Sequence, residues 1–330
     1  MDGVINVYKE SGFTSHDVVA KLRGILHTKK IGHTGTLDPD AVGVLPVCIG
    51  KATKLCGLIT DWNKTYEAVM LLGVTTDTQD ISGSELSRND VGVDERQVVE
   101  AVSSFVGEYD QIPPMYSALK YNGRKLYELA RDGIEVERKP RRVVIESIHI
   151  NDMNLLDTQK TVTFTVECSK GTYIRTLCED IGKKLGCGAC MMRLTRTRVG
   201  SFAIDDSLTL NQIAALVLKG GLDDKIVNID SLFHYESVII NEEYNRLLYN
   251  GNKLLYESCV SDESRAAYEN NMHYDSSVLY DGDALQQHSN VPEGERFRVY
   301  DCNNTFIGIY EVVEGFLQPI KMFYASDGIY

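Results

Sequence analysis

Apolar residues recur with two different periods along the chain. Between Thr14 and Leu26 they return every three or four positions, behind a hydroxyl residue that can cap a helix, which predicts an amphipathic helix. Between Val162 and Cys168 apolar and polar residues alternate, which predicts a half-buried strand. A helical stripe from Ile174 to Leu185 follows directly. The chain is therefore predicted to turn from strand to helix around residues 169–173.

Weaker patterns predict the remaining elements of this half. Residues 28–54 are rich in Gly, Thr, Pro and Asp, and they predict an ordered loop. A buried strand is predicted over Tyr66–Gly73. Three further helices are predicted, over Asp94–Phe105, Arg124–Arg131 and Thr209–Leu218. The elements indicate an α+β fold.

The texture changes near residue 235. Beyond it the sequence has only short β-like runs, at Val238–Ile240, Phe297–Tyr300 and Phe306–Val312. We expect two domains, 1–235 and 236–330, the second interrupted by an irregular polar insertion at 257–291.

Composition narrows the class of protein. The chain of 330 residues is 43% hydrophobic and 25% charged, which excludes a disordered or fibrous protein. It lacks both an apolar run long enough for a bilayer and a leader-like start, so we expect a cytoplasmic protein without membrane contact. Nothing in it demands more than a monomer. Cys187 and Cys190 have the spacing of half a zinc or thiol site, but without a second pair we interpret them as buried apolar residues.

The net charge of −13 argues at first against a nucleic-acid partner. Residues 1–200, however, hold 26 basic and 26 acidic side chains, so the whole excess of acid follows residue 200. Two stretches in the neutral part are basic: residues 120–142, with 8 bases to 4 acids, and residues 170–198, with 7 to 2. A polyanionic partner for the first domain is therefore not excluded.

The most unusual string is the loop from Gly32 to Val47, in which glycines, prolines and small hydroxyl residues surround Asp38. Pro39 biases Asp38 away from helical geometry and so fixes how its carboxylate is presented. A plain Asp-Pro turn is the alternative. The glycines fit neither a P-loop nor a dinucleotide-binding motif, so no nucleotide cofactor is expected.

A second string, Ser169 to Leu177, lies at the predicted junction of strand and helix. Arg175 falls in the first turn of that helix, where its permanently charged fork suits a carboxylate or phosphate. Asp38 is the candidate carboxylate. Tyr66, which begins a predicted strand, gains interest only beside these two.

Taken together, these strings resemble the TruB family of pseudouridine synthases. The matching segments run from about residue 3 to residue 233: Gly32-His-Thr-Gly-Thr-Leu-Asp-Pro39, Gly43-Val-Leu-Pro-Val47, Gly50-Lys-Ala-Thr-Lys54, Lys64-Thr-Tyr-Glu-Ala68, Ile112-Pro-Pro-Met-Tyr-Ser-Ala-Leu-Lys120, Tyr127-Glu-Leu-Ala-Arg131, Lys170-Gly-Thr-Tyr-Ile-Arg-Thr-Leu177 and Leu194-Thr-Arg-Thr-Arg-Val-Gly200. The resemblance implies a mixed, largely antiparallel sheet flanked by helices, followed by a small PUA-like β-barrel. It also implies isomerisation of uridine 55 in the T loop of tRNA.

The family's functional residues transfer position by position. The resemblance implies that Asp38 is the essential aspartate, that Tyr66 stacks on the target base and that Arg175 pairs with the aspartate. It makes His33 a T-loop contact and places Tyr173 and Leu194 in the pocket. Residues 113–142 match a mobile segment that clamps RNA. The basic residues predicted to contact RNA are Lys120, Arg124, Lys125, Arg131 and Lys170.

The chemistry is consistent with these roles, because a stacked uridine must leave the helix before its glycosidic bond can be reached. Our hypothesis is that Asp38 attacks C1′ or initiates glycal formation there, with attack at C6 as the competitor, and that Tyr66 assists removal of the C5 proton. Neither a metal nor an organic cofactor is expected. A catalytically idle RNA-binding or tRNA-folding protein on the same scaffold is the alternative. One departure from the family is Glu10, which follows Lys9 where a proline is usual.

Overall fold

The computed structural model describes residues 1–264 and 293–324. The chain divides into two compact units. The larger contains Ile5–Cys48 and Cys56–Lys225; the smaller contains Met1–Val4, Ile49–Leu55 and the chain from Ile226 onward. The domain boundary near residue 235 stays a prediction.

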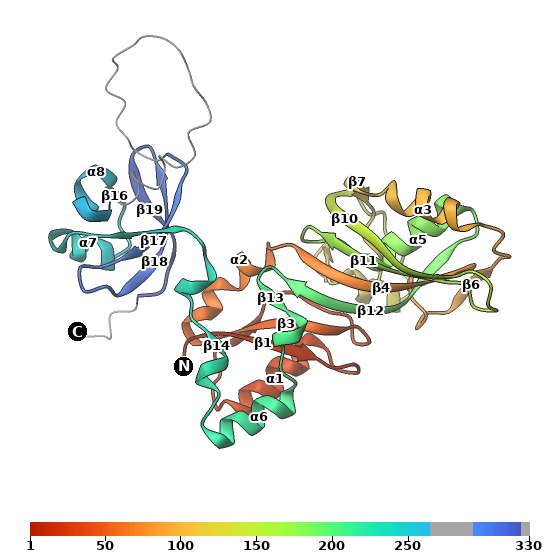
Figure 1. The fold of residues 1–330 in the computed structure, drawn as a ribbon, viewed down its shortest axis with the longest axis horizontal. Coiled ribbons are helices and arrows are strands. Elements are labelled where there is room, and N and C mark those ends of the chain that lie inside the picture. The colour runs from red at the N-terminus through yellow and green to blue at the C-terminus, as the bar shows by residue number, and fades with distance from the viewer. Residues whose placement is uncertain (265–292, 325–330) are drawn as a thin grey trace, which may run out of the picture. The chain divides into compact units, whose positions relative to one another are not determined.

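A mixed sheet organises the larger unit (Figure 1). Its strands, in spatial order, are β1 (Gly3–Lys9), β3 (Val42–Ile49), β12 (Ala189–Val199), β4 (Lys64–Leu72), β11 (Thr161–Cys168), β10 (Arg141–Asn154) and β7 (Gly107–Gln111). Short strands β2 (Ile31–His33) and β13 (Phe202–Ala203) pair with β3 and β12, and β5 (Val74–Thr76) pairs with β6 (Glu85–Arg88). From β12 to β7 every neighbour is antiparallel, whereas β3 and β12 are parallel, so the predicted mixed, largely antiparallel sheet is confirmed.

The predicted helices form, with capping residues where the sequence places them. They are α1 (Ser15–Ile25), α3 (Glu95–Ser103), α4 (Leu126–Arg131), α5 (Ile174–Leu185) and α6 (Leu210–Lys219). A further short helix, α2 (Cys56–Thr60), was not predicted. Thr14, Asp94 and Thr209 each cap a helix with a reciprocal capping box. Helices α3 and α5 pack on each other and on the sheet, and α1 packs on α6. The residues of α5 that face the sheet join its core with those of β4 and β11.

The prediction of a loop throughout residues 28–54 was wrong. Residues 42–49 form the buried strand β3, and residues 50–55 form a 3-10 helix. The glycine that suggested a loop is what lets β3 lie against β12. A Cβ on Gly43, whose φ is +107°, would come within 2.2 Å of the carbonyl oxygen of Arg196. This close approach joins the Asp38 loop to the centre of the sheet.

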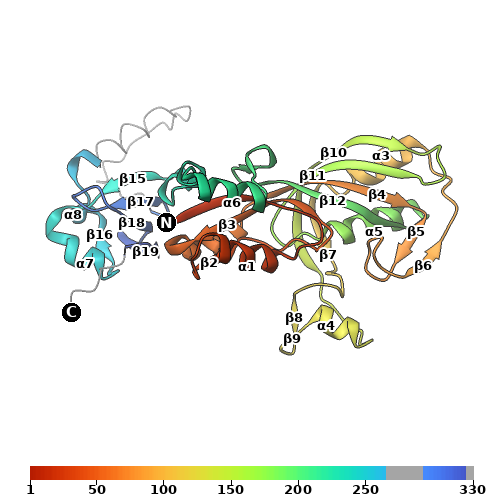
Figure 2. The same cartoon turned by 90° about the horizontal axis from the view of Figure 1, so that it is seen from below.

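Residues 112–140, between β7 and β10, form an arm that projects from the sheet (Figure 2). The arm contains a small hairpin of β8 (Lys120–Tyr121) and β9 (Arg124–Lys125), followed by α4. Asn122 and Gly123 connect the two strands with positive φ angles of 49° and 86°, as a tight hairpin turn requires. The predicted RNA-clamping segment is therefore an independent projection of the larger unit.

The smaller unit contains a curled, half-barrel sheet. Its strands, in spatial order, are β15 (Glu236–Ile239), β17 (Arg296–Tyr300), β18 (Phe306–Val313), β19 (Phe316–Met322) and β16 (Leu254–Leu255), accompanied by α7 (Asn245–Tyr249) and α8 (Tyr256–Cys259). The short strand β14 (Ile226–Val227) instead pairs with β1 at the edge of the mixed sheet. The three predicted β runs are confirmed. The predicted insertion at 257–291 lies outside the described residues from 265 onward. No helix in the described ranges is long and apolar enough to cross a membrane.

Candidate active site

The Asp38 loop is fastened at several points by backbone contacts. Leu37 N donates to Ser15 Oγ at 3.0 Å, and Lys9 Nζ, at the end of β1, donates to the carbonyls of Pro39 at 2.9 Å and Ala41 at 2.6 Å. The side chain of Lys9 is fully buried, and this burial lowers its pKa to about 8. Lys9 thus holds the backbone on both sides of Asp40, a role the sequence analysis missed. Glu10, where a proline is usual, supplies another carbonyl to the same ammonium at 3.2 Å.

Arg175, in the first turn of α5, meets Asp38 through two nitrogens. Arg175 Nε lies 3.0 Å from Asp38 Oδ2, and Arg175 Nη2 lies 3.3 Å from Asp38 Oδ1. The arginine side chain is only 6% exposed, whereas that of Asp38 is 40% exposed. The planar guanidinium of Arg175 therefore fixes the carboxylate of Asp38 from the buried side, and the exposed part of the carboxylate stays accessible to a ligand. The sequence-predicted pair is brought together.

The pKa of Asp38 is raised above its ordinary value, because burial outweighs the attraction of Arg175. Asp80 raises it further, while Lys9 lowers it. Arg175 thus favours the ionised form, as expected from the sequence, but does not cancel the cost of burying the charge. The carboxylate is consequently more basic than a free aspartate.

Asp80 is a second carboxylate in the cluster, and the sequence analysis did not single it out. Its Oδ2 lies 3.7 Å from Arg175 Nη1, which also donates to the carbonyl of Thr78 at 3.0 Å. Its Oδ1 accepts from Thr78 Oγ1, Ser82 N and Ser82 Oγ at 2.6–3.0 Å. The available signal was the dense run of hydroxyl and acidic residues at 75–80. Arg175 therefore links two acidic loops.

Tyr66 on β4 lies opposite Arg196 on β12. Arg196 is 1% exposed, and its guanidinium donates to Val44 O at 2.7 Å and Gly35 O at 3.3 Å. Burial raises the pKa of Tyr66, so its hydroxyl is neutral, although Arg196 pulls the pKa down. Leu194 packs in the same core cluster as Tyr66 and Leu37. The sequence analysis missed Arg196.

His33 begins the Asp38 loop and packs edge-on against His16, with ring centroids 5.1 Å apart. Its Nδ1 accepts from Gly35 N at 3.3 Å. Burial, followed by the nearby His16 and Arg196, lowers the pKa of His33, so its ring is neutral at physiological pH. A neutral ring suits stacking and hydrogen bonding better than phosphate neutralisation.

Tyr173 is the residue before α5, and burial raises its pKa. The arm reaches this point too, since Tyr116 O accepts from Arg175 Nη2 at 2.8 Å. A cavity of about 380 Å³ lies beside these contacts; its lining combines residues of the arm root, of the Asp80 loop and of α5, including Met115, Gln79 and Thr176. The helix entrance, the arm and the Asp80 loop therefore converge on Arg175.

The predicted RNA-contacting bases lie on exposed surface, apart from this cluster. Arg124 pairs with Asp132 at 2.5 Å, and Lys125 and Arg131 each lie 5.3 Å from the ring centre of Tyr127. Lys120 is exposed on β8. Lys170, before α5, pairs with Asp61 at 2.8 Å. Four of the five bases thus belong to the arm.

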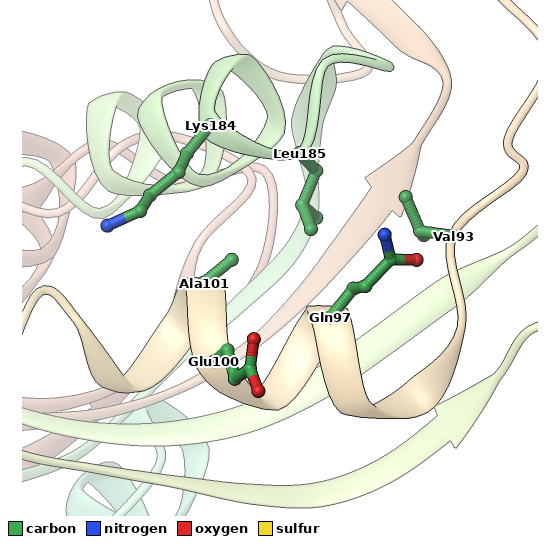
Figure 3. Close-up of a pocket in the computed structure, with 6 residues that line it drawn as sticks. All are labelled: Val93, Gln97, Glu100, Ala101, Lys184 and Leu185. Carbon is green, nitrogen blue, oxygen red and sulfur yellow. The ribbon is translucent and has the colours of Figure 1, made fainter.

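Two further features take no part in the cluster. A cavity of about 250 Å³ lies between α3 and α5 and is lined by Gln97 and Glu100 of one helix and by Lys184 and Leu185 of the other (Figure 3). Cys187 and Cys190 are both buried, the first in the main core and the second against Leu71 and Val74. Within residues 1–264 and 293–324 no cluster of His, Cys, Asp or Glu could hold a metal ion.

Comparison with known proteins places this geometry in a family. Residues 23–174 match the model of the TruB family pseudouridylate synthase N-terminal domain, and residues 175–234 match the tRNA pseudouridylate synthase B C-terminal domain. The tRNA pseudouridine synthase B of Lachnoclostridium phytofermentans is 48% identical over 98% of this chain and 100% of its own length. That of Clostridium acetobutylicum is 42% identical over 98% and 99%.

Solved structures give the same fold. A chain from the crystal structure of a Cbf5-Nop10-Gar1 complex matches with a TM-score of 0.68 and 25% identity, over 98% of this chain and 86% of that one. Full-length relatives, family models and fold therefore agree, and the chain belongs to the TruB family of pseudouridylate synthases.

Proposed function

We propose that this chain isomerises uridine to pseudouridine at position 55 in the T loop of tRNA, with Asp38 as the nucleophile. The observation that carries the proposal is the two-point contact of Arg175 with Asp38, which fixes a carboxylate that is still 40% exposed. The names of the full-length relatives support tRNA as the substrate.

The reaction changes no oxidation state. The C1′–N1 bond breaks, the base turns within the pocket, C1′ joins C5, and the proton on C5 leaves while N1 gains one. Asp38 either bonds to C1′ and holds the sugar during the turn, or removes a sugar proton to give a glycal, or adds to C6. Each route begins with an ionised carboxylate. Because the pKa of Asp38 is raised, the carboxylate is protonated more readily as pH falls, and the reaction should slow at acidic pH.

We expect Tyr66 to stack on the flipped base. Tyr66 is 9% exposed in the core cluster that also contains Leu194, and the charge of Arg196 opposes the rise in the pKa of its hydroxyl that burial causes. A base reaches the ring once the covering side chains give way slightly. We expect the neutral hydroxyl of Tyr66 to relay the C5 proton.

The arm is proposed to supply affinity rather than chemistry. Its exposed bases include Lys120 and Arg124, and Arg124 can exchange its pair with Asp132 for an RNA phosphate at little cost, because surface ion pairs are weak. His33, neutral and at the edge of the loop, is proposed to contact the bases of the T loop.

The test is release of tritium from tRNA labelled at uridine C5. We expect release to water from a transcript with uridine at position 55 and none from one with cytidine there. Asp38→Asn should bind this tRNA but release nothing, whereas Asp40→Asn, the matched change on the exposed neighbour, should act like the wild type. Binding without any release by the wild type would favour the idle RNA-binding protein instead.

A further inference from the structure

Gln111, which is not among the predicted site residues, joins the end of β7 to the start of α5. Its Nε2 donates to the carbonyl of Tyr173 at 3.0 Å, and its Oε1 accepts from Tyr173 N at 2.7 Å. The residue is 1% exposed. The side chain of Tyr173, the N-cap residue of α5, makes no capping hydrogen bond, and the amide of Gln111 instead fixes both backbone groups of this residue.

Gln111 is also the residue from which the arm departs. Its backbone pairs with Arg141, the first residue of β10, where the arm rejoins the sheet. Beyond it, the carbonyl of Tyr116 accepts from Arg175 Nη2 at 2.8 Å. The root of the arm therefore contacts the start of α5 at two places, and of these two it is the contact of Gln111 that holds the helix backbone.

We propose that Gln111 is a positioning residue, whose side-chain amide sets the start of α5 so that Arg175 meets Asp38. The inference rests on the proposed function. Arg175 stands two residues after Tyr173, and its contacts with Asp38, at 3.0 and 3.3 Å, leave little room for displacement. A shift of the helix entrance by about 1 Å separates the fork from the carboxylate. Gln111 reaches the proposed base pocket only through the backbone of Tyr173, and no hydrogen bond joins it to Asp38 in the part of the chain that the structure describes.

Two substitutions separate this role from simple packing. Gln111→Met keeps the length of the side chain but removes both hydrogen bonds. We expect the single-turnover rate constant to fall about tenfold, as small misplacements of reacting groups do, while the Kd for tRNA changes less than about twofold. Circular dichroism and thermal unfolding report whether this variant folds.

Gln111→Glu adds a readout that packing alone does not move. An ionised glutamate accepts from Tyr173 N but cannot donate to Tyr173 O, whereas a protonated one does both, as the amide does. Burial raises the pKa of a carboxyl here; Asp180, which Tyr109 contacts from β7, raises it further, and Arg141 opposes both. The ratio of variant to wild-type rate should therefore rise as pH falls. Gln318→Glu, on β19, is the control and should give a flat ratio.

The outcomes are distinct. A Gln111→Met variant that folds and turns over at the wild-type rate overturns the proposal, and so does a pH-independent ratio for Gln111→Glu. The pH dependence of Gln111→Glu decides the question even if Gln111→Met does not fold. A wild type that releases no tritium at all defeats the proposed function instead, and is recognised before any variant is compared.

Discussion

The Asp38 site and the arm both depend on charge, but they hold it in opposite ways. In the site, Arg175 is 6% exposed and is held by two carboxylates and two backbone carbonyls from distant parts of the chain. In the arm, Arg124 is about half exposed and pairs with an equally exposed Asp132 eight residues away. A buried charge has a fixed direction and alters the pKa of its neighbours, while an exposed one is screened and easily exchanged.

This difference separates two tasks. The position of one carboxylate, that of Asp38, is fixed by buried groups that contact one another and therefore cannot move independently. Affinity for a long, repeating polyanion is built from exposed groups, each replaceable by the next. Substitutions in the site should therefore change rate and pH dependence, whereas substitutions in the arm should change affinity and salt dependence.

The largest effect is expected from Arg175→Met. It removes the fork and leaves Asp38 without its principal attraction, so the single-turnover rate constant should fall by about 10²–10³. Arg175 lowers the pKa of Asp38, so without it that pKa rises and the acidic limb of the rate profile moves to higher pH. Tritium release across a pH series measures both. Arg175→Lys, which keeps the charge, should shift the acidic limb of the pH–rate profile less. If this limb did not move in Arg175→Met, Arg175 would have no influence on the ionisation of Asp38.

A smaller effect is expected from Lys9→Met, which removes the hydrogen bonds to Pro39 and Ala41 that hold the Asp38 loop. We expect a rate about tenfold lower with unchanged affinity for tRNA. The pKa of Lys9 is about 8, so its ammonium loses a donor as pH rises through that value. Wild-type activity should decline there, and the decline should be absent from Lys9→Met. Lys21→Met, on the exposed face of α1, is the matched control.

The same contrast explains what the sequence could predict. Periodicity identified α1 and α5, because the spacing of apolar residues depends only on the local helix or strand. Pairing of Asp38 with Arg175 was also expected, since each residue stands in an unusual string. The strand β3 was missed because its glycine and proline are local signals for a loop, while burial against β12 is a long-range effect.

Buried charges were the harder part. Arg175 and Arg196 count toward the basic stretch 170–198, yet both are buried and turned toward protein groups. Asp80 was overlooked because its importance arises from a contact with a residue 95 positions later. Counting charges along a chain cannot distinguish a fork turned inward from one turned outward, since only the assembled sheet decides this.

In the arm, Arg124→Ala combined with Lys125→Ala should weaken tRNA binding several-fold and leave the rate at saturation unchanged. The slope of log Kd against log salt should flatten by about one unit for each phosphate that the variant no longer neutralises. Filter binding at several salt concentrations gives the slope. Arg96→Ala, which breaks an exposed pair with Glu100 on α3, is the control and should not alter it. An unchanged slope in the double variant would remove both residues from the RNA interface.

The smallest effect concerns the thermal stability of the protein and tests whether the buried charge of Asp38 destabilises the folded state. The pKa of Asp38 is higher in the folded chain than its ordinary value of 3.8, so the folded state favours the neutral form and ionisation weakens it. This cost is present above the folded pKa and disappears as pH falls toward 3.8. Asp38→Asn, permanently neutral, should therefore unfold about 1–2 °C above the wild type at neutral pH, with the difference vanishing in acid. Calorimetry at several pH values measures it, with Asp40→Asn as the control. If Asp38→Asn were instead less stable than the wild type at neutral pH, the attraction between Asp38 and Arg175 would outweigh the cost of burying the charge of Asp38. The ion pair of the site, like that of the arm, would then carry no net cost of burial.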